Sequence, residues 1–312
     1  MEKGKILFID TAHGELRNRL ENQEFNCDYF KDYGRDEFLK IAHNYVGIIV
    51  RSKVKLDADF LRKCTNLKFI GRVGAGMENI DTQFAEDNDI VCLNAPEGNR
   101  DAVGEQAVGM ILSLFNNLLT ADAEVRNGVW IREGNRGYEL GGKTIGIIGY
   151  GNTGNAFARK LKGFDVEVIA YDKYKSDFSD EFVTEASMDE LYEKCDIVSL
   201  HVPLTNETEY LVVSEFINSF HKNIYIINTS RGKVLKTNDL VLGLKSKKIL
   251  GACLDVLEYE GLSFENMKLP DDIKDMLVMK NVVLTPHIAG WTHESNYKMA
   301  VTIAEKVRKL NM

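Results

Sequence analysis

The sequence predicts an α/β protein whose sheets are mostly parallel and whose chain forms two domains. Short β-rich runs alternate with helical patterns from one end of the chain to the other, as in sheets covered by helices. The 312 residues are enough for about two domains. A glycine-rich turn between a predicted strand and a predicted helix lies in the middle of the chain rather than near its start. That position indicates that one domain is inserted into another.

Two series of strand-like runs, with a helical segment between them, give the order of the elements. The runs of the first series are 5–9, 46–50, 68–72 and 90–93, and those of the second are 144–148, 166–171, 196–200, 224–228, 249–254 and 281–284. The segment between the series, about 102–126, is apolar on almost every side, so we expect a helix that is buried on every side. Such a helix would join the two domains and pack against a partner subunit.

An amphipathic pattern at the end of the chain, 294–310, is too short to form a domain. It follows the last strand of the second series, and we expect it to return to the first domain. The predicted division is a discontinuous substrate-binding domain, 1–100 plus 291–312, and an inserted domain, 101–290.

Composition and charge narrow the class of protein. With 44% hydrophobic and 28% charged residues, the chain is typical of soluble globular proteins. Its net charge of −8 argues against nucleic acid or an anionic membrane as the main partner, and no apolar run approaches the ~20 residues of a membrane span. The five cysteines are scattered, and the N-terminus leads directly into a predicted strand. We expect a cytoplasmic protein with reduced thiols, no bound metal and no signal peptide.

The most informative motif is the turn that follows the run at 144–148. It has the pattern Gly-x-Gly-x-x-Gly and consists of Gly149, Tyr150, Gly151, Asn152, Thr153 and Gly154, with a predicted helix after it and Asp172 at the end of the next strand. In such turns the glycines allow a tight turn, a close approach to a pyrophosphate and close packing of the helix, whose N-terminus attracts the phosphates. Asp172 can accept hydrogen bonds from both ribose hydroxyls and would repel a 2′-phosphate. The motif therefore predicts NAD rather than NADP.

Polar or glycine-containing segments follow the other strands of the second series. They contain His201, Pro203 and Thr208 after 196–200, Thr229, Ser230 and Arg231 after 224–228, Asp255 after 249–254, and His287 with Gly290 after 281–284. In doubly wound sheets, ligands bind beyond the carboxyl ends of the strands. This placement predicts one site at that edge, where we expect all of these residues except Arg231 and His287 to bind the cofactor.

These motifs resemble those of the D-isomer-specific 2-hydroxyacid dehydrogenases over nearly the whole chain. The matching segments are 72–81, 149–154 with Asp172, 201–205 with 207–208, 228–232, 255–256 and 286–290. The resemblance implies a Rossmann-type NAD-binding domain inserted in a flavodoxin-like substrate domain, a homodimer, and hydride transfer between NAD and a small anionic 2-hydroxy or 2-keto acid. It also implies that Arg231, Glu260 and His287 are the catalytic residues.

The reaction needs these three residue types. A proton must move to or from the C2 oxygen, and histidine, with an ordinary pKa of about 6.5, carries protons both ways near neutral pH. A carboxylate on the imidazole, such as that of Glu260, would fix the tautomer, and an arginine offers a fork for the substrate carboxylate and keto oxygen. We expect the backbone N–H groups of Val73, Gly74 and Ala75 to bind the other side of the substrate carboxylate.

Three assignments have competitors. The family usually has a proline directly after its catalytic glutamate, whereas this chain has Gly261 in a long acidic loop, and Glu258 is a rival for the role of Glu260. Asp255 either hydrogen-bonds the nicotinamide amide or caps a turn. His201 is expected to line the cofactor pocket rather than to transfer protons.

Two arginines of the first domain bear on the substrate. Arg51 and Arg72 each come at a strand end, and the resemblance to phosphoglycerate dehydrogenases implies that they bind a phosphate. The expected substrate is then 3-phosphoglycerate, oxidised to 3-phosphohydroxypyruvate in serine biosynthesis. If the arginines form only a solvated basic edge, the alternative is another short 2-keto acid, such as glyoxylate or hydroxypyruvate. A minor alternative is a non-catalytic NAD(H)-sensing protein similar to a corepressor. Since the sequence ends soon after His287, no C-terminal regulatory domain is expected.

Overall fold

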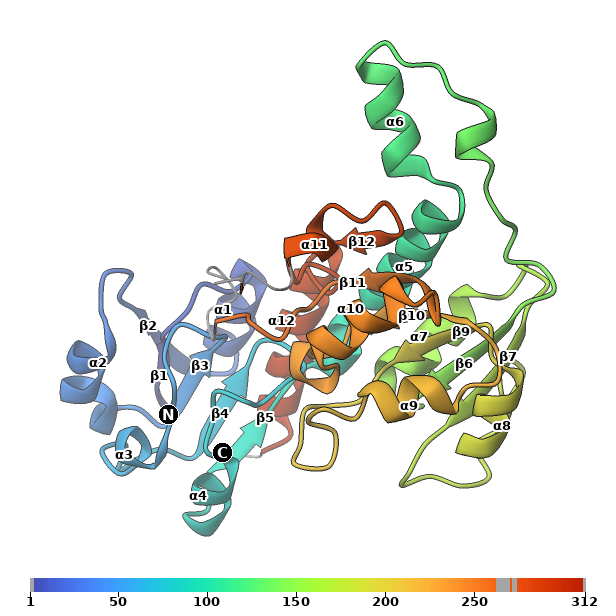
Figure 1. The fold of residues 1–312 in the computed structure, drawn as a ribbon. Helices are drawn as coiled ribbons and strands as arrows, with labels where there is room; N and C mark the ends of the chain where they lie inside the picture. The colour runs from blue at the N-terminus through green and yellow to red at the C-terminus, as the bar shows by residue number, and fades with distance from the viewer. Residues whose placement is uncertain (1–2, 262–269, 271–273, 311–312) are drawn as a thin grey trace. The chain divides into compact units, whose positions relative to one another are not determined.

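The fold is that of a computed structural model, which describes residues 3–261, 270 and 274–310. The chain divides into two compact units, one formed by 1–100 with 291–312 and the other by 101–290 (Figure 1). The acidic loop that the sequence predicts after Gly261 lies almost wholly outside the described residues. Each unit has its own parallel sheet, as expected for an α/β protein.

The first unit contains a five-stranded parallel sheet in the order β2-β1-β3-β4-β5, which is the flavodoxin-like order. The strands are β1 (Gly4–Phe8), β2 (Phe25–Tyr29), β3 (Gly47–Val50), β4 (Phe69–Arg72) and β5 (Val91–Leu93). The sequence did not predict β2. It is an edge strand in which the exposed Asn26 separates the buried Phe25 and Cys27, so it has no continuous apolar run.

Helices of the first unit connect its strands, and the last helix of the chain packs on the same sheet. They are α1 (Gly14–Glu21), α2 (Arg35–Ile41), α3 (Ala58–Leu61), α4 (Thr82–Asp87) and α12 (His293–Arg308). Met299, Ile303 and Val307 of α12 are buried in one apolar cluster with Ile6 and Phe69 of the sheet. The terminal helix is therefore part of the first unit's core, although the whole second unit lies between them in the sequence.

The second unit contains a seven-stranded parallel sheet in the order β12-β11-β10-β9-β6-β7-β8. Its strands are β6 (Thr144–Ile148), β7 (Glu167–Tyr171), β8 (Thr184–Glu185), β9 (Ile197–Leu200), β10 (Ile224–Asn228), β11 (Ile249–Leu254) and β12 (Val282–Leu284), and its shorter helices are α7 (Asn152–Lys160), α8 (Met188–Lys194), α9 (Ser214–Ser219), α10 (Thr237–Lys245) and α11 (Lys274–Leu277). The strand order reverses at β6, which pairs with β7 on one side and β9 on the other. Such a reversal is where doubly wound sheets bind dinucleotides.

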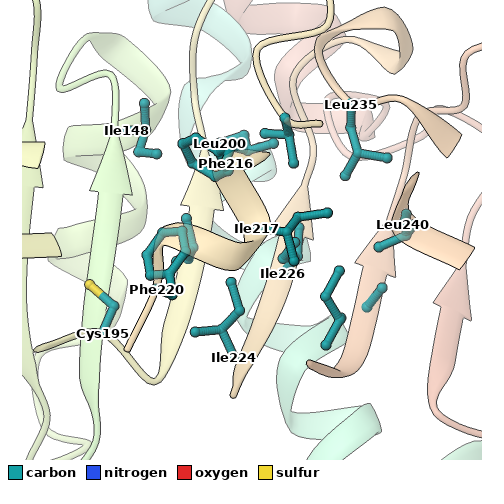
Figure 2. Close-up of a cluster of buried hydrophobic side chains, with 14 of the residues drawn as sticks. Ile148, Cys195, Leu200, Phe216, Ile217, Phe220, Ile224, Ile226, Leu235 and Leu240 are labelled. Atoms are coloured by element: carbon teal, nitrogen blue, oxygen red, sulfur yellow. The ribbon is translucent and has the colours of Figure 1, made fainter. Parts of the chain in front are cut away.

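Branched and aromatic side chains fill the core on one face of the second sheet. Figure 2 shows Leu200 of β9 and Ile226 of β10 with Phe216, Ile217 and Phe220 from α9 and its end, all buried in one cluster. Burying an apolar side chain of this size stabilises a fold by roughly 1.5–3 kcal/mol. This packing fixes β9 and β10, and therefore also the position of the residues that follow them.

The expectation of one helix at about 102–126 is wrong, and its burial on every side does not hold within one chain. It consists of two helices, α5 (Pro96–Phe115) and α6 (Leu118–Arg126), because Asn117 adopts a left-handed conformation with φ 52°. Ala107 and Ile111 of α5 are buried, but Leu118 and Leu119 of α6 are 52% and 58% exposed. In a single chain this segment is therefore not buried on every side, and Figure 1 shows α6 extending away from its sheet.

Candidate active site

The turn between β6 and α7 is shaped so that the chain needs glycine at two positions and is open at a third. Gly149 has φ 93°, and a Cβ there would lie 2.7 Å from the carbonyl oxygen of His201. A Cβ on Gly154 would lie 2.2 Å from the carbonyl oxygen of Gly149. Among the described residues, nothing lies within 4 Å of a Cβ built on Gly151, so another molecule has space to approach that backbone. These are the properties of a pyrophosphate-binding turn.

Asp172 follows β7, and backbone groups hold its carboxylate beside this turn. Its Oδ2 accepts a hydrogen bond from the N–H of Tyr150 at 2.9 Å, and its Oδ1 accepts one from the N–H of Tyr174 at 3.0 Å. Each carboxylate oxygen can accept more than one hydrogen bond. The group is thus fixed in orientation and still able to accept from ribose hydroxyls.

His201 is buried at the end of β9 and supports the start of α7. Its Nε2 lies 2.8 Å from Oγ of Ser199, and its Nδ1 lies 3.3 Å from Oγ1 of Thr153. Burial lowers the pKa of His201 to about 3, so the ring is neutral at physiological pH. With both ring nitrogens in contact with hydroxyls, this histidine is suited to holding the turn in place rather than to proton transfer.

The turn after β10 is organised by Asn228. Its Oδ1 accepts hydrogen bonds from the N–H and the hydroxyl of Ser230 at 3.1 and 2.8 Å, and its Nδ2 donates to the carbonyl oxygen of Arg231 at 3.0 Å. The buried hydroxyl of Thr229 in this turn has no hydrogen-bond partner among the described residues. A buried polar group without a partner is costly, and a polar ligand bound here would remove that cost.

The chain brings His287 and Glu260 together. Nδ1 of His287 lies 2.7 Å from Oε2 of Glu260, and the other carboxylate oxygen, Oε1, accepts a hydrogen bond from the N–H of Leu257 at 2.5 Å. Glu258 is engaged elsewhere, because it accepts from the hydroxyl of Tyr210 at 2.8 Å and from the N–H of Thr237 at 3.0 Å. Of the two rival carboxylates, Glu260 is therefore the one on the imidazole.

Asp255 holds the turn that presents His287. Its buried carboxylate accepts hydrogen bonds from the hydroxyl of Thr285 at 2.6 Å and from the N–H groups of Ile288 and Ala289 at 2.9 and 2.8 Å. His287 itself has φ 55°, a left-handed conformation that is rare for residues other than glycine. The turn-capping interpretation of Asp255 is therefore what the structure shows, and contact with the nicotinamide stays a prediction.

Arg231 follows β10, two strands from the strand that precedes His287. Its Nη1 donates to the carbonyl oxygen of Ser230 at 2.6 Å. A Cβ on Gly232 would lie 2.0 Å from the carbonyl oxygen of Leu257, so the backbone after Arg231 packs directly on the turn that carries Glu260. Only glycine permits this approach, which explains the Arg-Gly pair.

Arg51 lies in the first unit and contacts two residues that the sequence did not single out. Its guanidinium carbon lies 3.9 Å from the ring centroid of Trp291, a cation–π arrangement. Oδ2 of Asp10 accepts the backbone N–H groups of Arg51, Ser52 and Lys53 at 2.5, 3.0 and 3.2 Å. Asp10 follows β1, so the rule that placed polar residues at strand ends would have found it. No local signal marks Trp291.

The turn after β4 differs in part from its predicted use. A Cβ on Gly74 would lie 1.3 Å from Nη1 of Arg72, so the guanidinium lies directly over this glycine. The N–H of Val73 donates to the carbonyl oxygen of Val50 at 2.9 Å, and that of Gly74 donates to Arg72 at 2.9 Å. Both N–H groups are therefore engaged within the chain, and substrate binding by Val73 and Gly74 stays a prediction. Ala75 stays a candidate.

The remaining predicted residues lie in the loops of the second unit. The hydroxyl of Thr208 donates to the carbonyl oxygen of Pro203 at 2.6 Å and accepts from the N–H of Thr205 at 2.8 Å, which closes the loop after β9. Gly290 is the last residue of the second unit.

In the part of the chain that the structure describes, no helix is both long and apolar enough to span a membrane.

Comparison with known proteins decides the family. The model of the NAD binding domain of D-isomer specific 2-hydroxyacid dehydrogenases matches residues 108–289. The chain belongs to this family. The dehydrogenase is 35% identical over 304 residues to a hydroxypyruvate reductase of Thermotoga maritima, covering 96% of this chain and 95% of that protein. It is 32% identical to a D-3-phosphoglycerate dehydrogenase of Archaeoglobus fulgidus over 97% of this chain, but it spans only 56% of that relative.

A solved structure supports the same conclusion. The dehydrogenase resembles D-lactate dehydrogenase from Aquifex aeolicus, complexed with NAD and lactic acid, with a TM-score of 0.82 and 27% identity over 98% of this chain and 95% of that one. The chain is therefore an NAD-dependent oxidoreductase of D-2-hydroxy acids, with a Rossmann-type domain that binds NAD. The open backbone at Gly151 and the buried hydroxyl of Thr229, which has no hydrogen-bond partner in the described part of the chain, fit a bound dinucleotide.

Proposed function

We propose that His287 is the acid–base residue of the dehydrogenase, that Glu260 orients it, and that Arg231 holds the substrate. The 2.7 Å contact between Nδ1 of His287 and Oε2 of Glu260 carries this proposal. A carboxylate at Nδ1 fixes the tautomer and leaves Nε2 as the nitrogen that exchanges a proton with substrate. Reversible oxidation of a hydroxyl group needs such a nitrogen, which can both donate and accept a proton.

In the direction of reduction, a bound NADH would supply the hydride that adds to C2 of the 2-keto acid. Negative charge then develops on the keto oxygen, and His287 donates the proton of its Nε2 to that oxygen to form the hydroxyl group. Glu260 stabilises the protonated ring before this transfer. In the direction of oxidation, the neutral ring accepts the hydroxyl proton at the same nitrogen.

Arg231 is proposed to bind the substrate carboxylate and to polarise the keto oxygen. A guanidinium matches a carboxylate with two parallel hydrogen bonds and is charged at every physiological pH. The contact of its Nη1 with the carbonyl oxygen of Ser230 orients the side chain. In the first unit, the N–H of Ala75 and the guanidinium of Arg72 are further candidates for binding an anion.

For the substrate we propose 3-phosphoglycerate, oxidised to 3-phosphohydroxypyruvate, which would place the enzyme in serine biosynthesis in the cytoplasm. Val50 of β3 lies opposite Arg72 of β4, and Arg51 directly follows Val50. Two arginines thus come from adjacent positions at one edge of the first sheet. Stacking on Trp291 restrains the Arg51 side chain, which favours binding of a phosphate.

Hydroxypyruvate is the second candidate substrate. This chain spans almost the whole length of the hydroxypyruvate reductase of T. maritima, whereas the phosphoglycerate dehydrogenase of A. fulgidus is much longer. In addition, Asp10 places a negative charge on the backbone N–H groups of the Arg51 segment, where a phosphate would otherwise find donors.

Replacing Arg51 with alanine separates the two candidates. For a phosphorylated substrate, KM should rise about tenfold or more, because a charge-assisted contact to the phosphate is lost, while KM for hydroxypyruvate should change less than about twofold. Steady-state kinetics with NADH and both keto acids measure this difference. Arg62→Ala is the matched control, since Arg62 is exposed and forms an ion pair with the exposed Asp59 at 2.6 Å. An equal rise in both KM values would contradict the phosphate assignment.

We also propose that the dehydrogenase is a homodimer in which a second copy covers α6 and the segment after it. Leu118 and Leu119 are more than half exposed there, and Trp130 is 79% exposed. An exposed apolar surface of this kind marks an interface in soluble proteins. Sedimentation velocity should show a dimer, and a stable monomer at low protein concentration would remove the proposal.

A further inference from the structure

A second acidic residue, Glu207, lies in a loop beside the dinucleotide turn. β6 carries the turn, and its two neighbours in the sheet are β7 and β9. The segment after β7 begins with Asp172, and the segment after β9 runs from His201 to Glu207. Because the strands are parallel, both segments leave the sheet at the edge where the turn lies.

The side chain of Glu207, in the segment after β9, contacts two side chains of the segment after β7. Its Oε2 lies 2.8 Å from Nζ of Lys173 and accepts a hydrogen bond from the hydroxyl of Tyr174 at 2.5 Å. The side chains of Lys173 and Glu207 are 55% and 52% exposed, so apolar packing does not explain why they meet. Tyr174 is 80% exposed, although it is aromatic. The group is therefore accessible to a ligand bound at this edge.

Tyr174 links Glu207 to the carboxylate proposed to bind the ribose. Its N–H donates to Oδ1 of Asp172, and its hydroxyl donates to Glu207. A second basic residue nearby, Lys175, donates from Nζ to the carbonyl oxygen of Tyr150 at 2.7 Å. The cations and the hydroxyl that follow Asp172 are therefore all engaged by acceptors of the protein itself.

We propose that Glu207 is a second determinant of the preference for NAD over NADP. A 2′-phosphate on the adenosine ribose would need cationic and hydroxyl donors beside Asp172, and the donors closest in sequence are Lys173 and Tyr174. Glu207 engages both and adds a second negative charge near the position of that phosphate. The inference rests on the proposed role of Asp172 at the ribose, and it is independent of which keto acid is reduced.

Replacing Glu207 with glutamine tests this proposal. The variant removes the negative charge, so Lys173 becomes available to a 2′-phosphate. Equilibrium titration of the intrinsic fluorescence of NADPH and NADH, without keto acid, should show an affinity for NADPH that is about tenfold higher than in the wild type, and an affinity for NADH within about twofold. The gain should shrink at high salt, because the groups are exposed.

Glu209→Gln is the matched control, because Glu209 lies two residues away and pairs with Lys233 at 3.2 Å with similar exposure. It should leave the ratio of the two affinities unchanged. In Lys173→Ala/Glu207→Gln, the gain for NADPH should disappear. If Glu207→Gln binds NADPH no better than Glu209→Gln does, the proposal is overturned.

The variant Asp172→Ala distinguishes the failure of this proposal from failure of the cofactor site. It should raise the affinity for NADPH relative to NADH. If Asp172→Ala raises this ratio while Glu207→Gln does not, the proposed role of Glu207 is refuted and the assignment of the ribose to Asp172 stands. If Asp172→Ala leaves the ratio unchanged, the ribose is not at Asp172, and both proposals are overturned.

Discussion

Replacing His287 with alanine should lower kcat for reduction of a 2-keto acid by about a thousandfold. General acid–base catalysis contributes roughly 10²–10⁴ to a rate, and the keto oxygen would lose its proton donor. The dissociation constant of NADH should stay within about twofold, because the dinucleotide turn of Gly149–Gly154 lies on another strand of the sheet. Single-turnover oxidation of NADH and a binding titration measure the two quantities separately.

His293→Ala serves as the control for this variant. His293 is exposed at the first position of α12 and is not among the proposed site residues, so its removal should leave kcat within about twofold. A variant without His287 that kept most of the wild-type kcat would refute its role as the proton donor.

Replacing Asp255 with alanine should have the largest effect on stability. The change leaves the donors at Thr285, Ile288 and Ala289 without their buried acceptor and releases the left-handed turn at His287. Since each hydrogen bond to a buried charged group contributes about 1.5–3 kcal/mol, the free energy of unfolding should fall by about 3 kcal/mol or more. Urea denaturation measures this fall. The exposed Asp189 on α8 gives a control, because Asp189→Ala should change stability by less than about 0.5 kcal/mol.

The conservative variant Asp255→Asn adds a check based on pH. Burial raises the pKa of Asp255, so the folded protein binds this proton more tightly than the unfolded chain does. The wild type therefore loses stability as pH rises through the folded-state pKa, whereas asparagine does not titrate. The free energy of unfolding of the wild type minus that of Asp255→Asn should therefore be greater at about pH 4 than at about pH 8. A difference that grows with pH would contradict the assigned direction of the shift.

Several strands that the sequence predicted, such as β6 and β9, have continuous apolar runs buried on both faces. The missed strands lack that signal, since β2 alternates buried and exposed residues and β8 has only two residues. The hydrophobic pattern also did not predict that Asn117 separates α5 from α6. A left-handed residue there redirects the chain, and the apolar side chains that follow it are exposed within one chain.

In the site, residues close in sequence were easier to place than pairs that meet only in the fold. The glycine turn was predictable because its three glycines lie within six residues, directly between a strand and a helix. The choice between Glu258 and Glu260 was not, because it depends on Tyr210 and Thr237, which are remote in sequence. The stacking of Arg51 on Trp291 was not predictable either, because the two residues are far apart in the sequence.

A double-mutant cycle on Glu260 and His287 tests the central claim most directly, which is that these two residues act as one acid–base unit. Glu260→Ala alone should lower kcat about a hundredfold, because the imidazole loses its orienting carboxylate. If the pair acts as a unit, Glu260→Ala/His287→Ala should have a kcat within about twofold of His287→Ala alone. A double variant whose loss equals the product of the two single losses would show that the residues act independently and would contradict the account.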